Sequence, residues 1–203
     1  MSNYWQICSL GYFVRLFQLK VKKKNVPIKP VQMKGVDIEI VDAYKYLGVI
    51  IDNKLTWAQH IDKVYKKAQS RLFFLRKLKS FNVCNKMLLM FYETVICSIF
   101  SFALVCWGGN ATLRDKNKLN KIIKKAESCV GSKLDGIDII LSNVLMKKAL
   151  KIEKTELHPL HGILMMFKSR SNSRTKYVLP CISSDRYGKS FIPSGIKCLN
   201  AKK

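Results

Sequence analysis

The architecture of this chain follows from residues 55–78, which read Leu55-Thr-Trp-Ala-Gln-His-Ile-Asp-Lys-Val-Tyr-Lys-Lys-Ala-Gln-Ser-Arg-Leu-Phe-Phe-Leu-Arg-Lys-Leu78. Apolar residues recur here at spacings of three and four, and basic residues occupy many of the other positions, which predicts an amphipathic helix with one apolar side. Thr56 is its predicted cap, and Gln59 completes a capping box. The apolar positions are Ile61, Val64, Tyr65, Ala68, Leu72, Leu75 and Leu78.

Further helices are predicted downstream. Asn82 is the expected cap of a helix that runs through about Cys106, where Gly108-Gly109 would stop it. Thr112-x-x-Asp115 is a capping-box signature for the next helix, which Gly131 would end. That helix has Leu119, Ile122, Ile123, Ala126 and Val130 inside and Lys116, Lys118, Lys121, Lys124 and Lys125 outside. Three shorter helical segments are expected later, over about Ile137 to Ile152, over His158 to Lys168 after the His158-Pro159 corner, and at a last turn led by Pro193.

A small β-sheet is predicted before the first helix. Residues 31–41 alternate between apolar and polar side chains around Gly35, which favours a hairpin. A third strand, Tyr44 to Ile51, is nearly all apolar and closes at Asp52-Asn53. The second strand of the hairpin would place Val36, Ile38 and Ile40 on one face. The predicted class is therefore α+β, mostly α, with a hairpin sheet at 31–51 followed by a basic helical bundle.

The charge balance indicates a polyanionic partner. The chain carries 37 Lys and Arg against 13 Asp and Glu, a formal charge of +24, while 48% of its residues are hydrophobic, which is enough for a packed core. The 30 Lys far outnumber the 7 Arg, and this favours diffuse attraction to phosphates over base-specific recognition. We expect contact with nucleic-acid backbone through Lys63, Lys66, Lys67, Arg71 and Lys77 of the first helix and Lys121, Lys124 and Lys125 of the later one.

Two alternatives stay open at this point. Leu88 to Trp107 holds Glu93 as its only charge and meets the length of a membrane-spanning helix, so a small membrane-associated basic protein is the rival. Packing against the preceding amphipathic helix favours a buried core helix instead. A plain interaction module without a nucleic-acid role is the other alternative. Seven Cys without a C-x-x-C pair indicate a reducing compartment, cytoplasm or nucleus.

The motifs of metal and phosphate chemistry are missing from the sequence. Two-metal phosphoryl transfer needs converging carboxylates, and no Asp-Asp pair occurs. The H-x-D pattern of His60-Ile61-Asp62 lies inside a helix, where residues i and i+2 point in nearly opposite directions. His158 and His161 are interpreted as corner residues. We therefore predict no catalytic residue, no metal site and no cofactor.

An ordered series of motifs resembles the reverse transcriptases of non-LTR (LINE-type) retrotransposons over about residues 31 to 200. It consists of Tyr44-Lys-Tyr-Leu-Gly-Val-Ile-Ile-Asp-Asn-Lys-Leu-Thr-Trp57, Lys66-Lys-Ala-Gln-Ser-Arg-Leu-Phe-Phe-Leu-Arg-Lys-Leu78, Phe91-Tyr-Glu-Thr-Val, Cys106-Trp-Gly108, Lys121-Ile-Ile-Lys-Lys-Ala126, His158-Pro-Leu-His161 and Arg186-Tyr-Gly-Lys-Ser-Phe-Ile-Pro193.

The resemblance implies a polymerase fragment that binds nucleic acid without copying it. Tyr46, Leu47 and Gly48 match the family's primer grip, and the helices after them match the thumb that holds the template-primer duplex. The family's Tyr-x-Asp-Asp hairpin has no counterpart before Tyr44, so the implied partners are a duplex backbone and the remainder of the polymerase. The resemblance divides the chain into four parts. Residues 1–25 form an unassigned apolar and basic lead, and residues 26–53 form the end-of-palm hairpin. Residues 54–131 form a thumb-like helical bundle, and residues 132–203 form a carboxy-terminal helical extension.

A second likeness is confined to Lys66 to Lys86. This stretch is similar to the amino-terminal segment of the AlkB-like tRNA-modifying oxygenase and methyltransferase family, and it covers a single predicted helix. The oxygenase core and the methyl-donor site of that family are not recognisable in the sequence. Classification of the chain with that family would rest on this helix alone, and no methyltransferase or 2-oxoglutarate-dependent oxygenase activity is expected.

Overall fold

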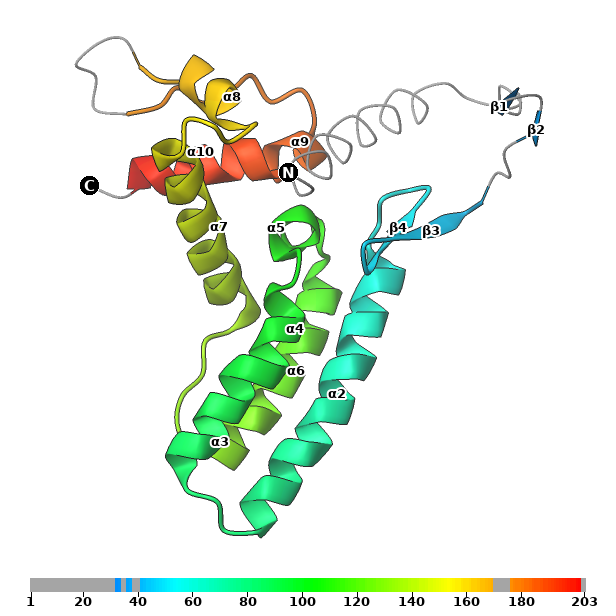
Figure 1. Ribbon diagram of the computed structural model, residues 1–203, viewed down its shortest axis with the longest axis vertical. Coiled ribbons are helices and arrows are strands. Elements are labelled where there is room, and N and C mark those ends of the chain that lie inside the picture. Colours follow the sequence, from blue (N-terminus) through cyan, green and yellow to red (C-terminus); the bar gives the residue numbers. More distant parts are fainter. Residues whose placement is uncertain (1–31, 34–35, 38–40, 170–175, 202–203) are drawn as a thin grey trace. The chain divides into compact units, whose positions relative to one another are not determined.

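A computed structural model describes residues 32–33, 36–37, 41–169 and 176–201 of the chain (Figure 1). The chain divides into two compact units, Met1–Thr56 and Trp57–Lys203. The described part of the first unit is made of short antiparallel strands, and that of the second is helical. The predicted fold class is confirmed. The lead at 1–25 lies outside the described residues.

The described part of the first unit contains two hairpins, where one hairpin and a third strand were predicted. β1 (Gln32–Met33) pairs with β2 (Val36–Asp37), as expected for a turn around Gly35, although the turn and positions 38–40 lie outside the described residues. β3 (Ala43–Tyr46) pairs with β4 (Val49–Asp52).

The prediction of a single third strand over Tyr44 to Ile51 is wrong, because the chain turns back at Leu47 and Gly48. These two residues have positive φ values of 46° and 89°, and Tyr46 lies opposite Val49. Two consecutive residues with positive φ fit a tight hairpin whose twist matches that of the strands. Glycine adopts this conformation without strain, whereas Leu47 concealed the turn within an apolar run.

The predicted capping role of Thr56 is also wrong. Its backbone N–H donates to Asp52 Oδ1 at 2.8 Å, and its hydroxyl donates to the same carboxylate. The first long helix, α2 (Ala58–Ser80), starts after Trp57, which has a φ of 65° and provides no side-chain cap. Thr56 therefore binds the carboxylate of Asp52 at the end of β4 and does not cap the helix.

The apolar side predicted for α2 is confirmed, apart from Tyr65 and Leu78, which are half-buried. The buried residues are His60, Ile61, Val64, Ala68, Leu72 and Leu75. α2 packs along α6 (Leu113–Val130) and against the segment that begins with α3 (Asn85–Phe91) (Figure 1). This packing forms the core of the helical bundle.

The segment from α3 onward is broken, where one helix to about Cys106 was predicted. Asn82 has a φ of 54° and lies before the helix, so it is not the cap. A π-helical stretch, η1 (Tyr92–Cys97), leads into α4 (Ser98–Ser101), and Ala103, with a φ of 50°, separates α4 from the next helical turn. The helical turn after Ala103 is α5 (Leu104–Trp107), and the 3-10 turn η2 (Gly108–Asn110) follows it.

The π-helical stretch is explained by the spacing of the buried residues. At most 3% of the surface of Leu88, Tyr92, Ile96, Phe100 and Leu104 is exposed, and each follows the previous one by four residues. Such a stripe drifts by about 40° per step around an α-helix of 3.6 residues per turn. A π-helical stretch turns less per residue, so it brings the stripe back towards the core.

In the part of the chain that the structure describes, the length and hydropathy expected of a membrane-spanning segment are met by one bent pair of helical segments. Among the described residues, no single helix has the length and apolar character needed to cross a membrane. Asn85–Ser101 and Leu104–Asn110 pass together on length and composition, with a bend of 41° between them.

The expected ends of α6 are confirmed. Thr112 Oγ1 accepts a hydrogen bond from the Asp115 N–H at 3.2 Å, and the Thr112 hydroxyl donates to the Asp115 carboxylate at 2.6 Å. Gly131 ends the helix with a φ of 76°, which glycine tolerates best. A local capping signal therefore determines this helix from the sequence alone.

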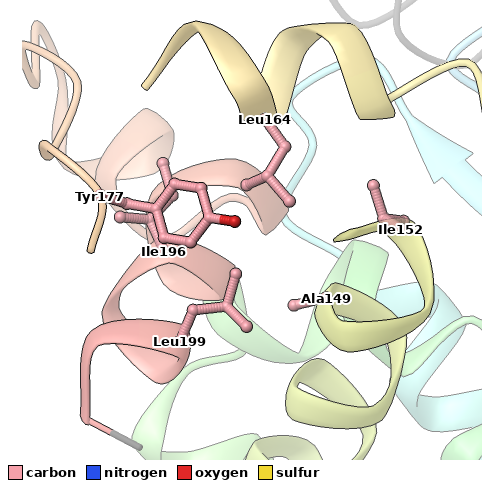
Figure 2. Close-up of a cluster of buried hydrophobic side chains, with 6 residues drawn as sticks. All are labelled: Ala149, Ile152, Leu164, Tyr177, Ile196 and Leu199. Atoms are coloured by element: carbon pink, nitrogen blue, oxygen red, sulfur yellow. The ribbon is translucent and has the colours of Figure 1, made fainter. Parts of the chain in front are cut away.

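The last part of the helical unit is built on α7 (Ile137–Lys154), as predicted. α8 (His161–Met166) is shorter than the predicted His158 to Lys168, and α9 (Asp185–Gly188) precedes α10 (Phe191–Ala201). Pro193 is the third residue of α10 and not its first, which is tolerated because first-turn N–H groups have no partner within the helix. Side chains from α7, α8 and α10 surround Tyr177 in a buried cluster (Figure 2): Ala149, Ile152, Leu164, Ile196 and Leu199.

Candidate nucleic-acid interface

A basic groove of about 450 Å³ lies between α2 and α6. The cations Lys66 and Arg76 reach it from α2, and Lys121 and Lys125 reach it from α6. No carboxylate is among the side chains that line it. The other lining residues are Tyr65, Gln69, Ser70, Leu72, Phe73 and Ile122.

The helical periodicity explains why these residues meet. Lys66, Gln69, Phe73 and Arg76 follow one another at spacings of three, four and three, so they form a stripe beside the buried face of α2. On α6, Lys121 and Lys125 are four residues apart and lie next to buried Ile122. Packing of the two buried faces brings the two basic stripes to the same groove.

The groove cations have no acidic partner among the described residues, whereas cations towards the start of α6 do. Lys118 forms an ion pair with Asp62, and its Nζ lies 4.8 Å from the centre of the Tyr65 ring. Lys116 pairs with Asp138 at 2.7 Å. Positive charge in the groove is therefore not balanced by an ion pair among the described residues.

The structure divides the predicted contact residues between several surfaces. Lys66, Lys121 and Lys125 line the basic groove. Lys124 lines a larger hollow of about 1400 Å³, which Lys121 also borders and which includes three carboxylates. Lys63 and Lys67 are exposed on α2 outside both.

Arg71 and Lys77 lie on the other flank of α2, in an apolar hollow that includes the rings of Phe74 and Phe81. The Arg71 guanidinium lies 5.8 Å from the centre of the Phe74 ring, and Lys77 Nζ lies 5.8 Å from that of Phe81. Arg76 was absent from the predicted contact set. Arg76 follows Phe73 by three residues and Gln69 by seven, so helical periodicity places all three on the same side of α2. This spacing is the signal that could have identified Arg76.

The residues matched to the primer grip occupy the β3–β4 turn. Leu47 and Gly48 are exposed at the turn itself, and Tyr46 is half-buried beside it. Gly48 has a positive φ, which is the local reason for a glycine at this position. Nothing in this geometry tests a primer contact, so the role stays a prediction.

The H-x-D pattern does not form a site. His60 is buried, with its ring 5.5 Å from that of Trp107 in an edge-to-face contact, and burial together with Lys63 lowers its pKa to about 4. Asp62 is exposed and paired with Lys118. Within the described ranges, no group of three His, Cys, Asp or Glu side chains is placed to hold a metal ion.

The other histidines serve the corner before α8. His158 Nδ1 accepts a hydrogen bond from the Leu160 N–H at 3.1 Å, and His161 Nδ1 lies 2.9 Å from the Ile152 carbonyl oxygen. Trp57, the residue before α2, is only 5% exposed and belongs to the core. Six cysteines lie in the described part of the chain, and all six are free thiols.

The model of one protein family matches residues 57–98, which is about a fifth of the chain. Its description is alkylated DNA repair protein alkB homolog 8, N-terminal. The match confirms the likeness predicted for Lys66 to Lys86, but it extends beyond one helix, over α2, α3 and η1. No curated protein and no solved structure matches the chain. The resemblance to reverse transcriptases is untested by this match and stays a prediction.

Proposed function

We propose that the helical unit binds nucleic acid through the phosphate backbone, without preference for sequence. The observation that carries this proposal is the α2/α6 groove, where four cations meet and no carboxylate lines the surface. Lys and Arg that neutralise phosphates release condensed counterions, and this provides affinity that does not depend on base sequence. The net charge of +24 adds long-range attraction to any polyanion.

We further propose that the chain derives from the end of the palm and the thumb of a LINE-type reverse transcriptase. The ordered motif series and a hairpin followed by a basic helical bundle support this origin. The catalytic aspartates of that family have no counterpart here, so the proposed role is binding and not polymerisation. An in-frame Tyr-x-Asp-Asp block in the transcript upstream of this chain is the expected finding, and unrelated sequence there would contradict the origin.

Salt dependence of binding tests the nucleic-acid proposal. We expect the affinity for a fluorescein-labelled duplex, measured by anisotropy, to fall steeply as salt rises. The variant Lys66→Gln/Arg76→Gln/Lys121→Gln/Lys125→Gln should lower the slope of log affinity against log salt by about 3 to 4, because each lost phosphate contact removes about 0.9.

The matched control removes the same charge elsewhere. Lys147, Lys151, Lys154 and Lys197 are exposed on α7 and α10, and changing all four to Gln should leave most of the slope in place. Equal losses in the two variants would show that net charge and not the groove drives binding. Affinity that does not change with salt would reject backbone binding altogether.

A second candidate comes from the family match. Residues 57–98 are similar to the amino-terminal part of alkB homolog 8, which is described as an alkylated DNA repair protein. We propose under this candidate that the segment is a non-catalytic part of such a protein, because the match leaves four fifths of the chain uncovered. The two candidates differ in the origin of residues 57–98, and neither expects an oxygenase reaction from this chain.

An assay of 2-oxoglutarate turnover tests whether the segment is non-catalytic. We expect the purified chain with iron(II) and ascorbate to form no succinate above the protein-free blank. Oxygenases of this kind hold iron with two histidines and a carboxylate, whereas His60 is buried and Asp62 is exposed and paired with Lys118. Succinate formation that disappears in His60→Ala would overturn this expectation.

A further inference from the structure

Phe73 is an exposed aromatic residue in the middle of the basic groove. Its side of α2 lines the groove, and 60% of its surface is exposed, so the ring is open to a ligand in the groove. Its ring meets Phe74 edge-to-face, with the ring centres 5.7 Å apart and the planes at 76°. This contact orients the Phe73 ring on a part of the surface that the core does not cover.

The cations of the groove line the same hollow as this ring. Lys66 precedes Phe73 by two helical turns, and Arg76 follows it by one. Lys121 and Lys125 lie across the groove on α6. A strand that places phosphates on these cations therefore passes the Phe73 ring at close range.

An aromatic ring among phosphate-binding cations suits single-stranded nucleic acid. In a duplex the faces of the bases are covered by their neighbours, so a ring at the backbone gains little. In a single strand each base has a free face, and stacking on an aromatic side chain adds affinity that does not depend on the identity of the base.

We infer that the α2/α6 groove binds a single strand of nucleic acid, with phosphates on Lys66, Arg76, Lys121 and Lys125 and one base stacked on Phe73. This inference rests on the proposed backbone binding and adds the strand form and the stacking residue. The rival occupant of Phe73 is an apolar protein surface, since Phe74 and Phe81 are exposed on the neighbouring flank.

The test compares an oligothymidine with an abasic oligonucleotide of the same length, both labelled for anisotropy. Phe73→Leu keeps an apolar side chain and removes the ring. We expect it to weaken oligothymidine binding by about 5- to 100-fold and to leave binding of the abasic strand unchanged, because only the former offers a base to stack. Phe81→Leu, at a residue 69% exposed outside the groove, is the control and should change neither affinity.

The outcomes separate this inference from the function on which it rests. If the unaltered chain binds neither strand nor a duplex, both the proposed function and the stacking role fail. If it binds both strands with a steep salt dependence and Phe73→Leu has no effect, the stacking role alone fails. Equal weakening of the two strands by Phe73→Leu would also overturn it, since the abasic strand has nothing to stack and the ring would then support the surface in another way.

Discussion

The free energy of unfolding of the helical unit is expected to fall by about 3 kcal/mol between pH 6.5 and pH 4, because His60 is buried as a neutral imidazole. Burial and the nearby Lys63 lower its pKa from 6.5 to about 4. Each unit of difference between the folded and unfolded pKa corresponds to about 1.4 kcal/mol.

The sign of the effect depends on where the proton binds. Below pH 6.5 the unfolded chain protonates His60, whereas the folded chain keeps it neutral until about pH 4. Protonation therefore favours the unfolded state over this range. The stabilising contribution is complete above pH 6.5 and is lost as the pH falls through 4.

Urea denaturation at several pH values measures this loss. The buried residues Trp57 and Trp107 provide the fluorescence signal, and Trp107 contacts His60 directly. In His60→Leu the decrease from pH 6.5 to 4 should be smaller by about 3 kcal/mol than in the unaltered chain. His158→Gln is the control, since that histidine is half-buried at a corner and should leave most of the decrease in place. An identical pH dependence in His60→Leu would contradict the assignment.

The sequence was a good guide where a local signal controls the backbone. The capping box of Thr112 and Asp115 and the end at Gly131 predicted α6 correctly, because each depends on residues within one helical turn. The apolar stripe of α2 was predicted for the same reason, as periodicity alone determines which side can be buried. These elements would be recognised in any chain that carries the same pattern.

Elements determined by tertiary packing were predicted wrongly. The β3–β4 turn passes through Leu47, a residue that local rules do not associate with positive φ, so an unbroken apolar run was interpreted as one strand. The π-helical stretch η1 arises from the need of a stripe spaced by four to keep facing the core. The spacing itself was readable in the sequence, and it indicates a helix that cannot stay regular.

The candidate site was predictable only in part. The sequence identified Lys66, Lys121 and Lys125 as outward-facing, but it could not show that α2 and α6 turn these side chains towards one groove. The rotation of the two helices also selects Arg76 and Phe73 and leaves Lys63 outside. Such selection depends on which buried faces meet, and a single helical wheel does not contain that information.

The largest loss of stability in the carboxy-terminal part is expected from Tyr177→Ala. Tyr177 is 1% exposed at the centre of the buried cluster that joins α7, α8 and α10 (Figure 2). Its N–H donates to Asn200 Oδ1 at 3.0 Å, and Asn200 Nδ2 donates to the Tyr177 carbonyl at 2.8 Å. The side chain thus fills the cluster while its backbone is held by α10.

The hydroxyl of Tyr177 adds a second connection, to α7. It donates to Glu153 Oε1 at 2.8 Å, and Lys176 forms an ion pair with the same carboxylate. Burial alone would raise the pKa of Glu153. The hydrogen bonds from Lys176 and Tyr177, together with the positive charges of Lys176 and Lys168, outweigh burial and lower it. In Tyr177→Phe, Glu153 keeps Lys176, so we expect a loss near the lower end of the range of about 1.5 to 3 kcal/mol that is typical of a hydrogen bond to a charged group.

Removing the whole ring should cost more than removing the hydroxyl. Replacing a buried aromatic residue by Ala typically costs about 3 to 5 kcal/mol, because a cavity remains when the neighbouring side chains cannot close it. Amide hydrogen exchange and urea denaturation followed by circular dichroism would measure the loss, with faster exchange in α7 and α10 than in α2 and α6. Val178→Ala, at the neighbouring residue 56% exposed, is the control and should cost under about 0.5 kcal/mol. A loss below about 1 kcal/mol for Tyr177→Ala would mean that this cluster does not hold the carboxy-terminal helices together, since a ring that fills a tight core cannot be removed so cheaply.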